Sequence, residues 1–136
     1  MEILASLAHG FSVAATTTNL AYCLFGVALG TLIGVLPGIG PAATLAMLLP
    51  MTFTLSPVTA LIMLAGIYYG SQYGGSTTSI LMRIPGEASS VMTCVDGYAM
   101  SQRGRGGAAL CIAAVGSFIA GTFGIIMLTL VAPPLA

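Results

Sequence analysis

Two short stretches of the sequence combine helix-breaking residues with groups that can bind ions. The first, residues 36–41, reads LPGIGP, and the second, residues 70–79, reads GSQYGGSTTS. A broken helix leaves free backbone N–H groups and a partial positive charge, which together bind anions such as carboxylates. Freed carbonyl oxygens can coordinate Na⁺ in the same place. The two stretches therefore predict a substrate- or ion-binding site, with these candidate residues: Pro37, Gly38, Gly40, Pro41, Gly74, Gly75, Ser76, Thr77, Thr78 and Ser79.

Few residues in this sequence could act as catalytic groups of an enzyme. An intramembrane serine protease could use Ser71 or Ser76 as its nucleophile, but it needs a general base within reach. His9 is the single histidine and lies far away near the N-terminus. Residues 38–43 fit the GxGxxA pattern of dinucleotide-binding folds, which also require an acid about 20 residues later. The next acid is Glu87. We therefore predict no enzyme and no cofactor beyond a coupling ion.

The composition is that of a membrane protein. Of 136 residues, 57% are hydrophobic and 4% are charged, whereas an ordinary soluble domain is about 25% charged. No Asp, Glu, Lys or Arg occurs between Glu2 and Arg83. The sequence has no basic patch that could contact nucleic acid. The three cysteines, Cys23, Cys94 and Cys111, are far apart and are interpreted as small buried hydrophobes rather than metal ligands.

The predicted fold is an all-α polytopic membrane protein with spanning helices and broken or re-entrant helical hairpins. Apolar stretches long enough to span, about 20 residues, cover residues 20–36, 59–82 and 108–132, and Asn19 is the expected N-cap of the first. Residues 42–55 are too short to span and predict a half-helix. Residues 1–19 predict an interfacial segment with Ile3, Leu4, Leu7 and Phe11 on one face.

The polar loop predicted at residues 83–107 carries the main signal for topology. Arg103 and Arg105 stand just before the last spanning segment. The positive-inside rule therefore places this loop in the cytoplasm.

Glycines recur at intervals of four residues in both of the first two spanning segments. One ladder contains Gly26, Gly30, Gly34 and Gly38, and the second contains Gly66, Gly70 and Gly74. Residues four apart share a helix face, and small residues there allow two helices to pack closely in a membrane. Each ladder runs into one of the two broken stretches, so the ladders predict either close packing alone or packing around a site.

Four longer motifs follow one another along the chain: GTLIGVLPGIGPAATLAMLLP, ALIMLAGIYYGSQYGGSTTSIL, PGEASSV and DGYAMSQRGRGGAAL. From about Leu4 onward the sequence resembles the large membrane subunit of bacterial tripartite tricarboxylate transporters, the TctA-type permease. That subunit is much longer, so residues 1–136 resemble its N-terminal portion. Arg83 departs from the resemblance, because a neutral residue is expected there.

The resemblance implies a secondary active transporter in the bacterial cytoplasmic (inner) membrane. Such a transporter imports tricarboxylates or related carboxylates and is driven by an ion gradient, either Na⁺ or H⁺. Its implied partners are a small membrane subunit, a periplasmic solute-binding protein and the surrounding membrane lipids. An alternative stays open: the segment could be a purely structural scaffold or oligomerisation unit that never contacts a substrate.

Overall fold

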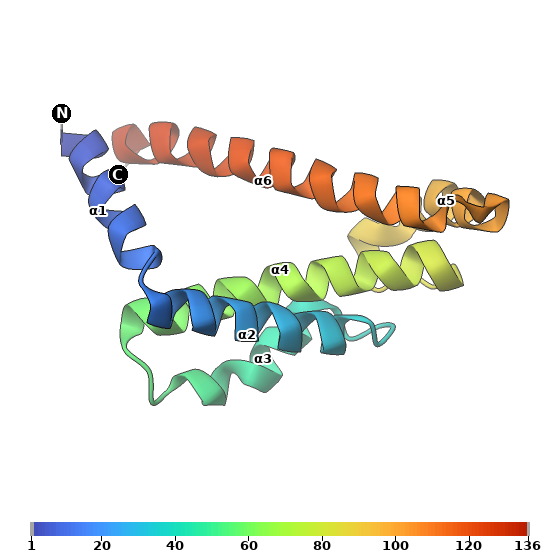
Figure 1. The fold of residues 1–136 in the computed structure, drawn as a ribbon, viewed down its shortest axis with the longest axis horizontal. Coiled ribbons are helices and arrows are strands. Elements are labelled where there is room, and N and C mark those ends of the chain that lie inside the picture. The colour runs from blue at the N-terminus through green and yellow to red at the C-terminus, as the bar shows by residue number, and fades with distance from the viewer. Residues whose placement is uncertain (1, 136) are drawn as a thin grey trace.

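The structure, a computed structural model, describes residues 2–135 and, among these, the side chains of residues 5–131. All regular secondary structure in this range is helical (Figure 1), which confirms the predicted all-α class. The elements are α1 (Glu2–Ala14), α2 (Thr17–Gly34), α3 (Gly40–Leu48), the 3₁₀ turn η1 (Leu49–Thr52), α4 (Pro57–Met82), the 3₁₀ turn η2 (Ala88–Ser90), α5 (Val91–Met100), the π-helical turn η3 (Ser101–Arg105) and α6 (Gly106–Leu135).

α2 and α4 pack against each other through both glycine ladders. A Cβ atom on Gly26 would lie 2.5 Å from the carbonyl oxygen of Met63, and one on Gly66 would lie 2.7 Å from that of Cys23. The other ladder glycines in these helices approach the facing backbone as closely: Gly30, Gly34, Gly70 and Gly74. A larger side chain would have to displace backbone, so the close packing predicted from the ladders is confirmed.

The same contacts show that α2 and α4 run in the same direction. Each step of four residues along α2, from Gly26 to Gly30 to Gly34, is matched by a step of four along α4. The facing α4 residues are Met63, Ile67 and Ser71. Two parallel helices cannot be joined by a short turn, so the chain between them must return along the length of α2.

α3 and η1 make this return, followed by the stretch 53–56 (Figure 1). α3 contains 9 residues and η1 contains 4. Both are shorter than a spanning helix, which needs roughly 20 residues. Pro50, in the first turn of η1, ends the α-helical part. The segment leads to the start of α4 and does not turn back to the end of α2. The segment predicted as a half-helix at 42–55 contains a short α-helix and a 3₁₀ turn, and the described residues do not show a re-entrant hairpin.

The second expected break is also absent, because α4 is continuous from Pro57 to Met82. The hydroxyls of Thr77, Thr78 and Ser79 donate to the carbonyl oxygens four residues earlier, at 2.9, 3.2 and 2.8 Å. Hydroxyls that donate to the carbonyl oxygen four residues earlier have a hydrogen-bond partner within the intact helix. The polar stretch 70–79 is thus helical, and it leaves no free helix N-terminus at Gly75.

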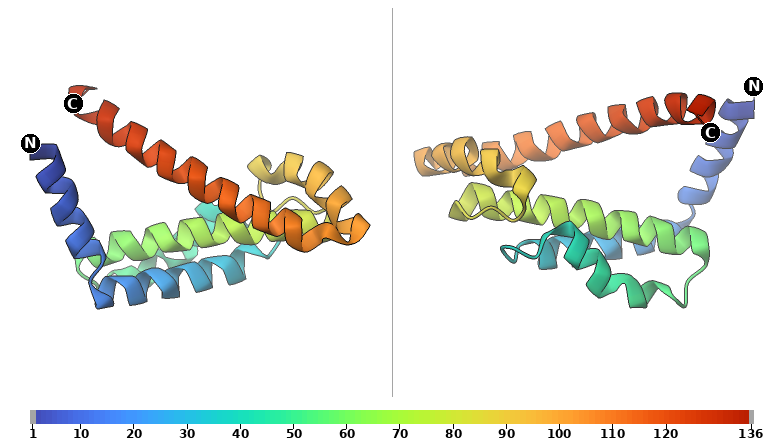
Figure 2. Two further views of the ribbon diagram at one scale, coloured as in Figure 1. Left: turned by 45° about the horizontal axis from the view of Figure 1, so that its top comes forward. Right: turned by 180° about the vertical axis from the view of Figure 1, so that it is seen from behind.

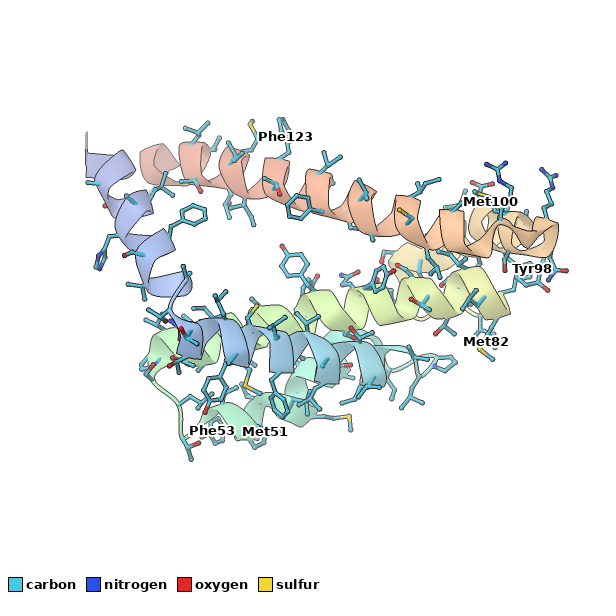
Figure 3. All side chains as sticks on the ribbon, in the orientation of Figure 1. Met51, Phe53, Met82, Tyr98, Met100 and Phe123 are labelled. Atoms are coloured by element: carbon cyan, nitrogen blue, oxygen red, sulfur yellow. The ribbon has the colours of Figure 1, made fainter. Side chains whose placement is uncertain are left out.

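α6 runs antiparallel to α4 and diverges from it. Near the start of α6, Gly106 faces Leu81, and further along Gly121 faces Tyr69. The two helices separate toward the end of α6 (Figure 2), and Phe123 lies on the side away from α4 (Figure 3). The segment 83–107, predicted as a polar loop, contains η2, α5 and η3.

α1 forms a separate arm that leads into the beginning of α2 and contacts it (Figure 1). Leu7 and Phe11 are exposed, while the side chains of Ile3 and Leu4 lie outside those described. Asn19 is not the N-cap of α2, because the helix already begins at Thr17 after Thr16. Asn19 is instead buried, donates to the Val13 carbonyl at 2.8 Å and accepts from the Thr59 hydroxyl at 2.7 Å.

Among the described helices, two stretches are long and apolar enough to cross a membrane, by length and composition. They are α2 and the stretch from Ala88 to Val131, which includes most of α6. α4 has 26 residues but is not one of them, and its polar half at 70–79 accounts for the difference. One face of that half, with Gly70, Ser71, Gly74, Gly75, Thr78 and Ser79, is buried against α2, α3 and the loop after α4.

Candidate functional site

The first broken stretch forms an exposed tip between α2 and α3. Gly38 and Gly40 both have positive φ, 85° and 66°, a backbone conformation that side-chain-bearing residues rarely adopt. A Cβ atom on either glycine would meet nothing within 4 Å. These two glycines are therefore needed for the backbone path of the tip and not for packing.

α3 begins directly at this tip. Gly40 is its first residue, and Pro41 stands in its first turn, where a missing N–H removes no helical hydrogen bond. The remaining free N–H groups of that turn receive no side-chain cap. Pro37 and Gly38 are exposed, and Gly40 and Pro41 are half-buried. The helix is thus interrupted at 36–41, and the start of α3 lies at the surface of the described residues.

Two buried hydroxyl contacts attach this tip to α4. Thr44 of α3 and Ser71 of α4 lie 3.1 Å apart, oxygen to oxygen, and both side chains are buried. Thr78 of α4 donates to the Val35 carbonyl oxygen at 2.8 Å, just beyond the end of α2. The structure thus attaches the residues on both sides of the stretch 36–41 to the stretch 70–79, although the two stretches are not two facing helix starts as predicted.

A second group of contacts lies near the end of α4, where residues 84–90 fold back onto the helix. A Cβ atom on Gly75 would lie 3.4 Å from the Gly86 Cα atom, and one on Gly86 would overlap the Gly75 backbone. Buried Ser79 donates to the Ser90 hydroxyl at 3.0 Å. Gly74, in contrast, is covered by Thr31 of α2. Close backbone contact therefore explains both glycines of the Gly74–Gly75 pair.

Ser76 and Thr77 are the only half-buried side chains of the predicted 74–79 group. Ser76 lines a groove of about 490 Å³ between α4 and α6. The groove also contains Tyr69, Gln72, Tyr73, Ala114, Ser117, Phe118, Gly121, Thr122 and Ile125. Thr77 does not line this groove, and its hydroxyl bonds within α4. The predicted residues therefore lie in different places. Those of 37–41 form the tip, Ser76 lines the groove, and most of the others are buried on α4.

Sequence reasoning missed Thr44, Ser90 and Gly86, and considered Ser71 only as a nucleophile. Ser71 and Thr78 are separated by seven residues and flank Gly74 and Gly75, which places them on one face of α4. That spacing was a usable signal for Ser71. Thr44 and Ser90 come from other elements, so only the tertiary structure shows that they meet α4.

The charged side chains do not assemble into a metal site. Among the described residues, no group of three or more His, Cys, Asp or Glu could hold a metal ion. Arg83, the C-cap of α4 with φ 60°, places its guanidinium carbon 5.6 Å from the centre of the Tyr98 ring, within the range of a cation–π contact. Buried polar side-chain atoms in the described part of the chain all have hydrogen-bond partners.

Comparison with known proteins identifies relatives of this chain. The model of the TctA family, described as the tripartite tricarboxylate transporter TctA family, matches residues 20–136. A protein of Agrobacterium vitis, described as an uncharacterized 52.8 kDa protein in the TAR-I ttuC' 3'region, is 60% identical over 136 residues. The match covers 100% of this chain and 27% of that protein, so the chain spans about a quarter of the relative's length. No solved structure matches.

The resemblance drawn from the sequence is confirmed by the extent of the family match. The family consists of membrane transport proteins and not of enzymes, in accord with the two stretches capable of spanning a membrane. The chain belongs to the tripartite tricarboxylate transporter TctA family and corresponds to an N-terminal portion of a longer member.

Proposed function

We propose that the chain forms part of a secondary active, ion-gradient-driven importer of tricarboxylates or related carboxylates. It would work in the bacterial cytoplasmic membrane with a small membrane subunit and a periplasmic solute-binding protein. The carboxylate would bind at the tip of residues 36–41 and the start of α3. The family match to a tripartite tricarboxylate transporter supports this substrate class and a multi-subunit system.

One structural observation carries the proposed binding role: α3 starts at an exposed double-glycine tip with uncapped N–H groups. A helix start binds anions through those groups without any formal charge nearby. The Thr44–Ser71 and Thr78–Val35 contacts hold the tip against α4. The start of α3 is therefore fixed in position relative to the helix pair, as a binding site requires.

The scaffold alternative is favoured by a different observation, the occupation of both glycine ladders by helix packing. Gly26 and Gly66, for example, lie directly under the facing backbone and cannot touch a solute. For the six ladder glycines within α2 and α4, a set that does not include Gly38 of the tip, we therefore propose packing and no substrate contact. The two roles concern different residues and can be tested separately.

The test compares three glycines that share a positive φ and have open space around them. Gly38→Ala, Gly40→Ala and Gly104→Ala introduce similar backbone strain, of order 1–3 kcal/mol, but Gly104 lies in η3, away from the tip. Uptake of labelled citrate would be measured with the full-length protein and its partner subunits in membrane vesicles. We expect the two tip variants to weaken carboxylate affinity about tenfold or more, and Gly104→Ala to leave it unchanged.

Equal effects of all three variants would contradict the proposal, because strain alone would then explain the loss. Normal affinity in both tip variants, with normal amounts of folded protein, would also contradict it. In that case the scaffold reading would account for this part of the chain.

A further inference from the structure

The groove of about 490 Å³ between α4 and α6 is open along α6. Its walls include Gln72 and Tyr73 of α4 and Ser117 and Phe118 of α6. The two helices separate toward the end of α6 (Figure 2), and the Phe118 side chain is 75% exposed. None of residues 110–131 is buried. α6 therefore presents a long surface that no described element buries.

The polar groups of the groove do not bond from one wall to the other. Thr122 donates to the Phe118 carbonyl oxygen at 2.7 Å within α6, and Gln72 donates to the Tyr68 hydroxyl at 3.0 Å within α4. In the described part of the chain, no hydrogen bond joins α4 to α6. The polar side chains that line the groove are thus open to a partner from outside the two helices.

These polar groups lie deep within the stretch that is apolar enough to cross a membrane. Ser117 follows Arg105 by 12 residues, which is about 18 Å along an α-helix. The hydrocarbon core of a bilayer is about 30 Å thick, and an arginine at the end of a helix keeps its charge at the surface of that core. Ser117 is therefore near the middle of the membrane. Lipid tails offer no hydrogen-bond partner there, so the groove favours a covering of protein.

α6 has two rows of side chains with different character. One row, with residues three or four apart, is large, apolar and exposed: Ile112, Val115, Ile119, Phe123, Ile126 and Leu130. Phe123 of this row lies on the side away from α4 (Figure 3). The groove instead receives the small residues Ala114, Ser117 and Gly121. Small residues let helices approach closely in a membrane, whereas large apolar side chains are compatible with lipid. The groove side is thus suited to another helix.

The full-length protein contains a partner for this groove in the same chain. The relative that is 60% identical has about three quarters of its length outside the part that matches residues 1–136. In such a protein the chain that continues beyond α6 leaves from the end at which α4 and α6 stand apart (Figure 2). Consecutive elements usually lie side by side, and a helix tethered to α6 has a high effective concentration at the groove.

We propose that the groove is the docking surface for the first membrane-spanning helix that follows α6 in the full-length protein. This helix returns across the membrane, so it runs antiparallel to α6 and parallel to α4. It packs on Ala114, Ser117 and Gly121, supplies partners to the polar wall and leaves the row with Phe123 to lipid. The proposal does not depend on the identity of the transported solute.

Photo-crosslinking from α6 provides the first test. Phe118 in the groove and Phe123 on the far side are 75% and 65% exposed, so they form a matched pair on one helix. Each would be replaced by the photoreactive amino acid p-benzoylphenylalanine in the full-length protein, in membranes that also contain its partner subunits. After irradiation, the apparent mass on a denaturing gel separates a crosslink within the chain from one to another protein. Mass spectrometry of the digest then identifies the crosslinked peptide.

We expect position 118 to crosslink within the chain to the first spanning helix beyond residue 136, and position 123 to give little of this product. A crosslink from position 118 to a later segment, to a second copy, to the small membrane subunit or to lipid alone would overturn the proposal. Equal yields of the same product from both positions would also overturn it, because the groove side would then not be the docking side.

Stability of the full-length protein provides a second test. Ser117→Trp and Ile119→Trp add the same side chain two residues apart, on nearly opposite sides of α6. Both positions are exposed in residues 1–136, so a difference between the variants reports on a partner outside this part of the chain. We expect Ser117→Trp to lower the melting temperature in detergent, because the indole occupies the place of the docked helix, and Ile119→Trp to leave it unchanged. A native melting temperature for Ser117→Trp would show that no helix docks at this position.

Discussion

At the scale of single residues, neighbouring hydroxyls on α4 have different tasks. Thr77 is half-buried and bonds only to the Tyr73 carbonyl within its own helix. Thr78 is buried and bonds both to Gly74 and to Val35, beyond the end of α2. Two adjacent threonines of α4 therefore differ in role: Thr78 forms a hydrogen bond between two elements, and Thr77 forms one only within α4.

This difference predicts that Thr78→Val destabilises the protein more than Thr77→Val. Removing the Thr78 hydroxyl removes its hydrogen bond to the Val35 carbonyl oxygen, and one such bond contributes about 0.5–1.5 kcal/mol to stability. Melting temperatures of the full-length protein in detergent would show it. Equal melting temperatures for the two variants would mean that the Thr78–Val35 bond adds no stability.

At the scale of elements, the tight contact between α2 and α4 explains the ladders at 26–34 and 66–74. Gly30→Ala would drive its methyl group into the Ile67 backbone, whereas a Cβ atom on Gly116 of α6 meets nothing within 4 Å. A helix pair that cannot relax its backbone would have to separate to accept the methyl group.

We therefore predict that Gly30→Ala lowers the melting temperature and the amount of folded full-length protein, while Gly116→Ala changes neither. Both variants add the same methyl group to a helical glycine. The comparison thus cancels the small gain in helix propensity that Ala brings. A stable Gly30→Ala protein would show that the α2–α4 packing can adjust.

An element could be predicted from the sequence where its structure depends only on residues close to it in the chain. Ladder packing was predictable because a spacing of four is a property of one helix. The break at 36–41 was predictable because two prolines and two positive-φ glycines act on their own backbone. The state of 70–79 was not, since a Gly–Ser–Thr stretch can be a broken or an intact helix. Contacts from other parts of the chain determine whether the helix stays intact. Here Gly74 packs against the backbone of α2, and Gly75 packs against Gly86.

At the scale of the whole molecule, the parallel direction of α2 and α4 determines which ends lie together. Thr16 and Ser56, the N-caps of these two helices, lie at one end of the molecule, and the turn after α4 lies at the other (Figure 1). A 26-residue helix such as α4 is about 39 Å long. This length exceeds the roughly 30 Å hydrocarbon core of a bilayer.

The arrangement predicts opposite labelling of its two ends in the full-length protein. Cysteines replacing Thr16 and Ser56 should react with an impermeant maleimide from the periplasmic side. A cysteine replacing Gln102, beside Arg103 and Arg105, should react only from the cytoplasm. The background must lack the native cysteines, because Cys111 is exposed. Labelling of Ser56→Cys and Gln102→Cys from the same side would contradict a crossing by α4.

The parallel pairing also has a consequence for how the chain is made. α2 leaves the ribosome first, yet the surface that covers Gly26, Gly30 and Gly34 belongs to α4 and is synthesised only after all of α3 and η1. Ribosomes add about 5–20 residues per second, so the glycine face of α2 waits on the order of seconds for its partner. During biogenesis that face must be covered by lipid or by the insertion machinery, and a stalled nascent chain ending before Ile67 would present it for crosslinking.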